Sequence, residues 1–125
     1  MTRRTVGVVD NDPGMLKAVV RLLTAHGFRV EPYISAEAFV QDLVGNQVTC
    51  LVVDIHLDGM SGIDLRRRLT ALEHAPPVIF MTAFDNPATH QEATDAGCAA
   101  YLLKPFPASQ LIEAINKVAN LPVNS

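Results

Sequence analysis

Four polar residues stand where apolar runs of the sequence end, and their side chains together could bind a phosphoryl group. Asp10 and Asp54 each close such a run, Thr82 closes a third, and Lys104 directly follows a fourth. Two carboxylates suit a hard divalent cation such as Mg²⁺, which prefers oxygen ligands. A lysine ammonium and a threonine hydroxyl suit phosphoryl oxygens, and a positioned carboxylate can accept a phosphoryl group when cations offset the charge repulsion.

Each of these residues also has a simpler interpretation when it is taken alone. A strand-end aspartate usually caps a helix or a turn, a threonine at that position reflects β propensity, and a lysine before a proline is usually a surface residue. The interpretation as a joint site therefore depends on whether the fold brings the four residues to one place.

Five apolar runs alternate with segments of helical periodicity, which predicts a parallel sheet covered by helices on both faces. The runs are Thr5–Asp10, Phe28–Tyr33, Cys50–Asp54, Pro77–Thr82 and Ala99–Leu103. Their nearly continuous hydrophobicity is expected of strands that are covered on both faces. Because ligands of open parallel sheets bind outside the carboxyl ends of the strands, the four polar residues are expected to converge there.

Five helices are expected to follow these strands. The first has Asp12 as its N-cap and Pro13 as its first residue, and it ends at Gly27. The second begins after Ser35 and stops at Gly45-Asn46. The residues expected to face the sheet are Met15, Ala18, Val19, Leu22 and Leu23 in the first helix, Ala36, Phe39, Val40 and Leu43 in the second, and Leu65, Leu69 and Leu72 in the third.

The remaining helical segments differ in how much apolar surface they offer. The fourth, about Pro87–Ala96, has only alanines as apolar residues, whereas the fifth, near Ala108–Ala119, has Leu111, Ile115 and Val118 at regular spacing. The arginines of the third helix, Arg66, Arg67 and Arg68, are interpreted as a solvated helix face.

Length, charge and cysteine content limit the class of protein. The 125 residues suit a single domain over 1–125 with an ordered core of about 5–119. A net charge of -3 argues against a nucleic-acid-binding surface, and no apolar run is long enough to span a membrane. The start of the chain does not resemble a signal peptide, and Cys50 and Cys98 are expected to be buried free thiols, so a cytoplasmic protein is expected.

The chain resembles the receiver domain of bacterial two-component response regulators, and more specifically receivers of the nitrogen-fixation regulator type. The motifs that carry the resemblance are VVDND at Val8–Asp12, LVVDIHLDGMSG at Leu51–Gly62, VIFMTAF at Val78–Phe84 and YLLKPF at Tyr101–Phe106. The resemblance covers essentially the whole chain. It implies an α/β fold, a flavodoxin-like doubly wound five-stranded parallel sheet with strand order 2-1-3-4-5 and five helices.

The resemblance also implies a phosphoryl transfer to this chain. Asp54 would be the phosphoacceptor, and the donor would be a phosphohistidine of a sensor histidine kinase or a histidine phosphotransfer protein. Asp10, Asn11, Asp54 and the backbone carbonyl of His56 would bind Mg²⁺. The only reactions expected are transfer to Asp54 and hydrolysis from it, so the chain is not expected to act as an enzyme on other substrates.

A conformational switch is a further implication of the resemblance. Thr82 and Lys104 would sense the phosphoryl group, and Tyr101 would turn inward when Thr82 moves. The Lys104-Pro105 peptide bond is expected to be cis. Output is expected on the surface made by the fourth helix, the fifth strand and the fifth helix, as partner docking or as a phosphorylation-dependent homodimer.

Three residues depart from the family's pattern or modify it. Asn11 stands where the family usually has an acid, which predicts weaker Mg²⁺ binding; Asp12 could compensate, although its predicted role is the helix cap. Asp58 stands where receivers usually have proline and is expected to form a turn with Gly59. Phe84 is expected to shield the acyl phosphate from water and to slow its hydrolysis.

Two other functions fit part of the sequence. Asp10-Asn11-Asp12 matches the D-x-D motif of a haloacid-dehalogenase-like phosphohydrolase, in which Asp10 would be the nucleophile and Asp12 the acid/base. However, the chain leaves no room for the usual cap or for the paired downstream acids. A flavodoxin-like binding module is disfavoured because the loop Asp10–Gly14 is acidic, whereas a phosphate cradle needs glycines and hydroxyls.

Overall fold

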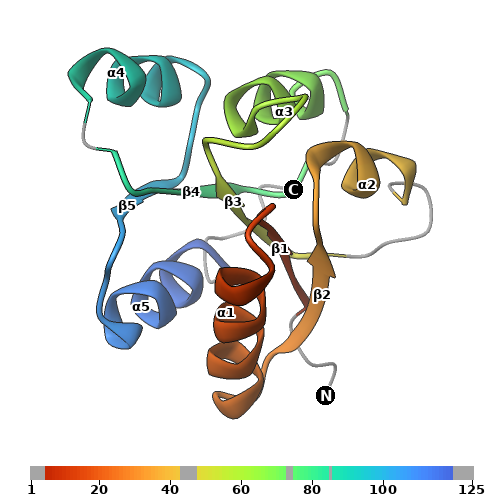
Figure 1. Ribbon diagram of the computed structural model, residues 1–125, viewed down its shortest axis with the longest axis vertical. Helices are drawn as coiled ribbons and strands as arrows, with labels where there is room; N and C mark the ends of the chain where they lie inside the picture. The colour runs from red at the N-terminus through yellow and green to blue at the C-terminus, as the bar shows by residue number, and fades with distance from the viewer. Residues whose placement is uncertain (1–4, 43–47, 73–74, 85, 120–125) are drawn as a thin grey trace.

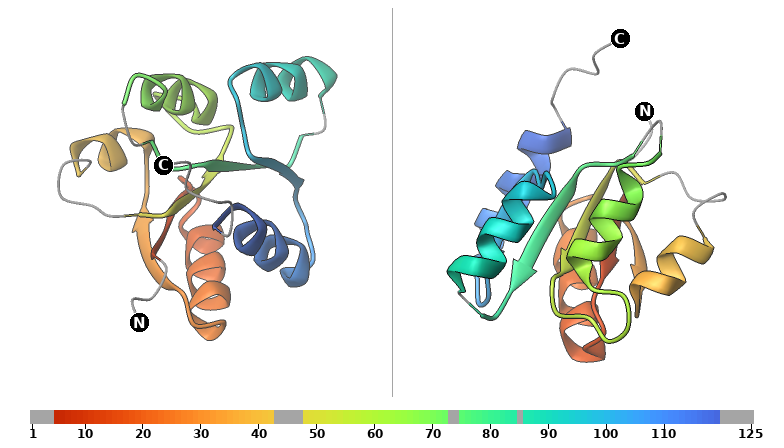
Figure 2. Two further views of the ribbon diagram at one scale, coloured as in Figure 1. Left: turned by 180° about the vertical axis from the view of Figure 1, so that it is seen from behind. Right: turned by 90° about the horizontal axis from the view of Figure 1, so that it is seen from above.

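The computed structural model describes residues 5–42, 48–72, 75–84 and 86–119. Within these residues, five parallel strands form one sheet in the order β2-β1-β3-β4-β5, as predicted. The elements are β1 (Thr5–Val9), α1 (Pro13–Ala25), β2 (Arg29–Tyr33), α2 (Ala36–Gln41), β3 (Cys50–Asp54), α3 (Gly62–Leu69), β4 (Val78–Thr82), α4 (Pro87–Asp95), β5 (Ala100–Leu103) and α5 (Ala108–Ala119). Helices α1 and α5 cover one face of the sheet, and α2, α3 and α4 cover the other (Figures 1 and 2).

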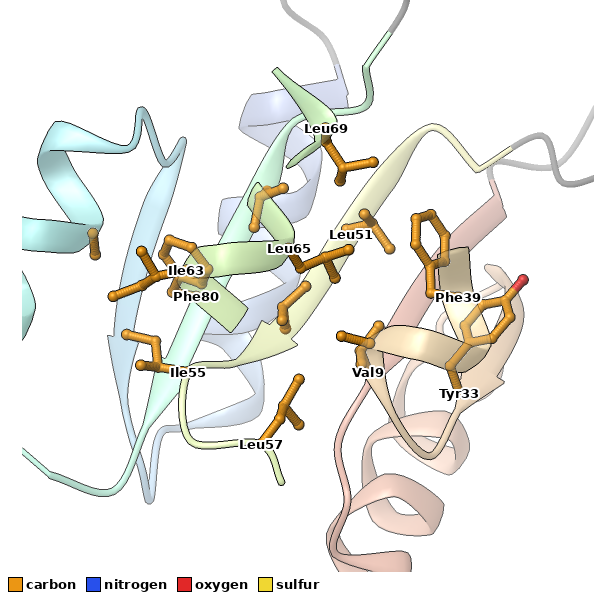
Figure 3. Packing of buried hydrophobic residues seen from close by; sticks show 14 residues of the cluster. Val9, Tyr33, Phe39, Leu51, Ile55, Leu57, Ile63, Leu65, Leu69 and Phe80 are labelled. Carbon is orange, nitrogen blue, oxygen red and sulfur yellow. The ribbon is translucent and has the colours of Figure 1, made fainter. Parts of the chain in front are cut away.

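Two apolar clusters hold the helices to the sheet, because successive strand residues point to opposite faces. One cluster lies under α1 and α5 and includes Val6, Val8, Val52, Ile79, Val19, Leu23, Leu111 and Ile115. The other lies under α2, α3 and α4 and includes Val9, Leu51, Val53, Phe80, Phe39, Leu65, Leu69 and Ala93 (Figure 3). Strands β3 and β4 are buried along their whole length, so the expected burial on both faces is confirmed for the centre of the sheet.

Strand β2 does not follow that expectation. It is an edge strand in which Arg29, Glu31 and Pro32 are exposed, and Phe28 precedes it. An edge strand leaves one row of backbone groups without a neighbouring strand, which is why charged residues and proline are tolerated there.

The helix starts were predicted correctly. The Asp12 carboxylate accepts hydrogen bonds from the backbone N–H groups of Gly14 and Met15, at 3.0 and 3.4 Å. The Ser35 hydroxyl accepts one from the backbone of Ala38 at 3.0 Å. After α1 the chain turns through Gly27, whose φ of 88° lies in the left-handed region that favours glycine. The predicted stop of the second helix at Gly45-Asn46, and Leu43 with it, lies outside the described residues.

Two of the predicted inward-facing residues are exposed. Ala18 lies on the solvent side of α1, because the buried stripe of that helix is centred on Val19 and Leu23. Leu72 is 40% exposed because α3 ends at Leu69, three residues before it. Leu111, Ile115 and Val118 of α5 are buried, and α4 buries Ala93 alone among its residues, as expected.

The expected solvated face of α3 holds for Arg67 and Arg68, which are exposed, but not for Arg66. Arg66 is half-buried because its Nε donates to the carbonyl of Gly97, which follows α4, at 3.2 Å.

Both cysteines were expected to be buried free thiols, and this holds for Cys50 but not for Cys98. Cys50 is a buried free thiol, and burial raises its pKa to about 12. Cys98 is also free but only half-buried. In the described parts of the chain, no helix is long and apolar enough to cross a membrane.

Replacing Gly62 by alanine is expected to destabilise the fold by about 3 kcal/mol, at the upper end of the cost of overpacking. Gly62 begins α3, and its backbone N–H donates to the Ile55 carbonyl at 3.0 Å. A Cβ at this position would lie 2.5 Å from the Asp54 carbonyl oxygen and 3.0 Å from the Ile55 Cα, and neither backbone atom can rotate away. Urea unfolding of the two proteins measures the difference.

The matched control is Gly14→Ala, near the start of α1. A Cβ there would meet only the Asp12 carboxylate, at 3.4 Å, which is an ordinary contact. Because alanine favours helices over glycine, this variant is expected to be as stable as the parent or more stable by up to about 1 kcal/mol. Equal unfolding free energies for the two variants would contradict the close approach of α3 to β3.

Candidate functional site

The carboxyl edge of the sheet gathers the polar residues that the sequence analysis singled out. Asp10 follows β1, Asp54 ends β3, Thr82 ends β4 and Lys104 follows β5. Asp10 and Thr82 are fully buried and Asp54 is 7% exposed. The strands that carry Asp10, Asp54 and Thr82 are neighbours in the sheet, so the topology itself brings these side chains to one edge.

Lys104 joins the two aspartates directly. Its Nζ donates to Asp54 Oδ2 at 2.8 Å and to Asp10 Oδ2 at 3.1 Å. The other oxygen of each carboxylate accepts a backbone N–H at 2.9 Å, from His56 for Asp54 and from Asp12 for Asp10. Each carboxylate is thus fixed through both of its oxygens, which preorganises the pair for a further ligand.

The charges in this group are unequal, since one ammonium faces two carboxylates. Burial raises the pKa of Asp10, against the opposing effects of the Asp12 N–H and of Lys104. Burial by itself would lower the pKa of Lys104, but the hydrogen bonds and charges of Asp54 and Asp10 outweigh it and raise that pKa. Two carboxylates thus share one ammonium, so the site favours an additional cation.

Thr82 and Tyr101, the predicted switch residues, contact different parts of the structure. The Thr82 hydroxyl accepts a hydrogen bond from the Phe84 backbone N–H at 3.1 Å and donates to the Phe84 carbonyl at 3.4 Å. Tyr101 lies half-buried on β5, and its ring stacks on that of His90 from α4, with 4.1 Å between the centroids. The stacking of His90 on Tyr101 was not predicted, because it depends on how α4 lies across β5.

The loop after β3 is held at two points that sequence reasoning also missed. Asp58 accepts a hydrogen bond from the Asn11 side-chain amide at 2.9 Å. Glu37 of α2 accepts one from the Met60 backbone N–H at 2.9 Å, and this bond lowers the pKa of Glu37. Contacts between positions so far apart in the sequence have no local signal.

Two aromatic rings meet beside the phosphoacceptor candidate. His56 and Phe84 pack edge to face, with 5.1 Å between the ring centroids and an interplanar angle of 88°. They come from the loops after β3 and β4, two residues beyond Asp54 and Thr82 respectively. Phe84 is 63% exposed, so this ring faces solvent. The Lys104-Pro105 peptide bond is cis, as predicted.

The residues at this edge fit Mg²⁺, although the set is poor in charge. Asp10 and Asp54 already bind one cation, the Lys104 ammonium, at hydrogen-bonding distance. No group of three or more acidic, histidine or cysteine side chains suited to a metal occurs among the described residues. A metal here would therefore use amide or backbone carbonyl oxygens besides the two carboxylates, and Mg²⁺ accepts such ligands.

Comparison with known proteins places the chain in one protein family. The model of the response regulator receiver domain matches residues 6–116. Among curated proteins, the transcriptional regulatory protein FixJ of Rhizobium meliloti is 34% identical over 119 residues, which are 95% of this chain and 58% of that protein. The response regulator protein TmoT of Ectopseudomonas mendocina is 32% identical over 114 residues, 91% of this chain and 52% of that protein. The chain thus spans about half the length of these relatives.

Solved structures agree with this result. The crystal structure of FixJ-N superposes with a TM-score of 0.90 at 33% identity and covers 100% of both chains. The response regulator StyR superposes with a TM-score of 0.85 at 36% identity, over 94% of this chain and 60% of that one. A CheY-like receiver domain protein from Methanospirillum hungatei, at 23% identity and a TM-score of 0.89, supports the fold alone.

Proposed function

Because the chain belongs to the response regulator receiver domain family, we propose that it accepts a phosphoryl group onto Asp54 in the cytoplasm. The donor is the phosphohistidine of a sensor histidine kinase or of a histidine phosphotransfer protein. The observation that supports Asp54 most strongly is its position at the end of β3, with one oxygen on a backbone N–H and the other on Lys104. We further propose that residues 1–125 act as one receiver domain.

The transfer follows from the groups around Asp54. A carboxylate oxygen of Asp54 forms a bond to phosphorus while the bond between phosphorus and the histidine nitrogen breaks, and that nitrogen leaves with the bonding electron pair. Lys104, 2.8 Å from the carboxylate, offsets the negative charge of the arriving phosphoryl oxygens. The Thr82 hydroxyl exchanges its bonds with the Phe84 backbone for a bond to a phosphoryl oxygen.

Asp10, Asn11, Asp54 and the His56 carbonyl are the residues proposed to hold Mg²⁺. When bound, Mg²⁺ would supply positive charge that reduces repulsion between the carboxylate and the phosphoryl oxygens. Asn11 contributes an amide oxygen without charge. Most of the electrostatic attraction for the cation would come from the buried carboxylates of Asp10 and Asp54.

The phosphohydrolase alternative is disfavoured by the position of Asp12. That mechanism needs the carboxylate of Asp12 as a proton donor next to Asp10. The carboxylate instead accepts two backbone N–H bonds at the start of α1. A carboxylate engaged in this helix cap is not free to act as the proton donor.

The switching surface of the proposal is formed by α4, β5 and α5. Helix α4 has little apolar surface to hold it, since Ala93 is its one buried residue in the structure. When Thr82 turns toward the phosphoryl group, it withdraws from the Phe84 backbone in the segment that leads to α4. Thr82 pairs with Leu103 of β5, two residues beyond Tyr101, so its movement also reaches β5. We propose that this shift favours a self-associated form of the chain or the docking of an output partner.

Acetyl phosphate with Mg²⁺ tests the proposed function without a cognate kinase. The chain is expected to acquire a phosphoryl group that hydroxylamine removes, as it does from an acyl phosphate. Light scattering on the same sample is expected to show an increase in mass on phosphorylation. A chain that stays unlabelled at saturating Mg²⁺ would overturn the proposal, and labelling without a change in mass would overturn its self-association part.

Replacing Phe84 by alanine is expected to shorten the lifetime of the phosphorylated chain by about tenfold. The reason is that a site that excludes water protects a reactive group such as an acyl phosphate from hydrolysis. The Phe84 ring contacts the ring of His56, which lies two residues beyond Asp54, and we propose that the two rings shield the acyl phosphate from water. The decay of the label after removal of the donor gives the rate. Ile34→Ala removes another exposed apolar side chain, 48% exposed, and is the control expected to leave the lifetime unchanged. A Phe84→Ala lifetime equal to that of the parent would contradict shielding.

A further inference from the structure

Two departures from the family's pattern contact each other in this structure. Asn11, in the place of an acid, donates its side-chain amide N–H to a carboxylate oxygen of Asp58, in the place of a proline, at 2.9 Å. The two residues are 47 positions apart and belong to the loops after β1 and β3. A carboxylate only accepts hydrogen bonds, so the amide nitrogen of Asn11, and not its oxygen, faces Asp58.

We propose that Asp58 replaces the acid that position 11 lacks, as a positioning residue for the Mg²⁺ site. The inference rests on the proposed function, because it concerns the same site. Asp58 acts in two ways: its bond to the Asn11 nitrogen leaves the Asn11 oxygen as the group available to a cation, and its charge adds to that of Asp10 and Asp54. Carboxylates that hydrogen-bond a metal ligand in this way orient it and increase its basicity.

The loop that carries Asp58 is built to keep that side chain in place. Glu37 of α2 accepts the Met60 backbone N–H at 2.9 Å, and the intervening Gly59 has a φ of 74°. Glycine permits this turn, and a Cβ on Gly59 would lie 2.5 Å from a carboxylate oxygen of Glu37 and disturb its bond to Met60. On the other side of Asp58, Leu57 is buried in the core cluster under α2 and α3. Asp58 is thus the exposed residue between two fixed neighbours.

Other charged groups near Asn11 are committed elsewhere. Asp12 is a second candidate for the missing acid, but its carboxylate caps α1 through Gly14 and Met15. Glu37 bonds to the Met60 backbone, not to Asn11. In the described structure, Asp58 is the carboxylate that bonds to the side chain of Asn11.

The test is a titration of the unphosphorylated, ¹⁵N-labelled chain with Mg²⁺ alone, in which the amide shifts of the loops after β1 and β3 report binding. Asp58→Asn removes the charge and keeps a group that can accept the Asn11 bond, whereas Asp58→Ala removes both. Mg²⁺ affinity is expected to fall about tenfold for Asp58→Asn, which is the smaller end of the usual loss when a residue that hydrogen-bonds a metal ligand is removed. The affinity of Asp58→Ala is expected to fall further.

The matched control is Asp95→Asn at the end of α4. Asp95 accepts an amide N–H from Gln91 at 2.8 Å, so this variant removes the same charge from the same kind of hydrogen bond. Asp95 is the last residue of α4, and the segment that follows β4 leads into the first residue of that helix. Salt screens exposed charges over such a distance, so the charge of Asp95 is expected to have little effect on Mg²⁺ binding. Asp95→Asn is expected to keep the affinity of the parent.

A rescue separates this role from a structural one. Asn11→Asp restores a carboxylate at the usual position, so it is expected to recover the affinity that Asp58→Asn loses, and to tighten binding in the parent. The inference is overturned if Asp58→Asn and Asp58→Ala bind Mg²⁺ as the parent or Asp95→Asn does, or if Asn11→Asp recovers nothing. These outcomes are independent of the phosphoryl acceptor, because no donor is present; failure of the proposed function would instead appear as absence of label at saturating Mg²⁺.

Discussion

Asp54→Asn is expected to lose all labelling by acetyl phosphate while it remains folded. An asparagine amide at this position keeps the size of the side chain and its bond to the His56 N–H, but it has no carboxylate oxygen to attack phosphorus. The substitution also leaves Lys104 with Asp10, one ammonium with one carboxylate. Because it removes the excess negative charge of a buried group, the variant is not expected to unfold at a lower temperature than the parent. Intact-protein mass spectrometry measures the label.

The control for this experiment is Asp58→Asn at saturating Mg²⁺. It removes a carboxylate from the same loop, and it is expected to accept the phosphoryl group because Asp54 is intact. Full labelling of Asp54→Asn would contradict the assignment of the acceptor and would direct attention to Asp10, the nucleophile of the phosphohydrolase alternative.

Lys104→Ala is expected to destabilise the chain by about 3 kcal/mol at pH 7, the cost of removing one partner from a buried ion pair. It leaves Asp10 and Asp54 facing each other without the ammonium that bridges them at 3.1 and 2.8 Å. Mg²⁺ is expected to restore part of the loss, because a cation that binds the folded chain alone stabilises it by mass action. Urea unfolding with and without Mg²⁺ measures both effects, and labelling is expected to be slower.

The pH dependence of this difference follows from the pKa of Lys104. The neighbouring carboxylates raise that pKa in the folded chain, so the stability contributed by Lys104 is fully present below its unfolded value, about 10.4. It is lost as the pH rises through the folded value. The difference between Lys104→Ala and the parent is therefore expected to shrink in strongly alkaline solution. Lys17→Ala, at an exposed lysine of α1, is the control; an effect equal to that of Lys104→Ala would contradict the charge argument.

The fold could be predicted because its signals are local. The alternation of apolar runs with helical periodicity gave the layers, and the caps Asp12 and Ser35 marked helix starts through their own short-range bonds. Periodicity fails where a helix ends earlier than its pattern, as at Leu72, or where a strand lies at the edge of the sheet, as at Glu31. Both depend on which element lies next to the residue, and that is a property of the whole fold.

The candidate site, like the fold, could be predicted in part. Asp10, Asp54 and Lys104 were expected to meet because they stand at the carboxyl ends of strands of one parallel sheet, and the structure brings them into contact. The bonds of Asn11 to Asp58 and of Glu37 to Met60 could not be predicted, since they join loops and helices whose side chains meet only after the elements pack. Asp58 was visible in the sequence as a departure from the family, but its partner was not.

The most direct test of the central claim is to locate the phosphoryl group on the chain. Phosphorylation by acetyl phosphate with Mg²⁺, followed by borohydride reduction, converts a phosphorylated aspartate into homoserine, which peptide mass spectrometry then places in the sequence. We expect homoserine at position 54 and nowhere else. Homoserine at position 10, or at any other aspartate with position 54 unchanged, would contradict the central claim.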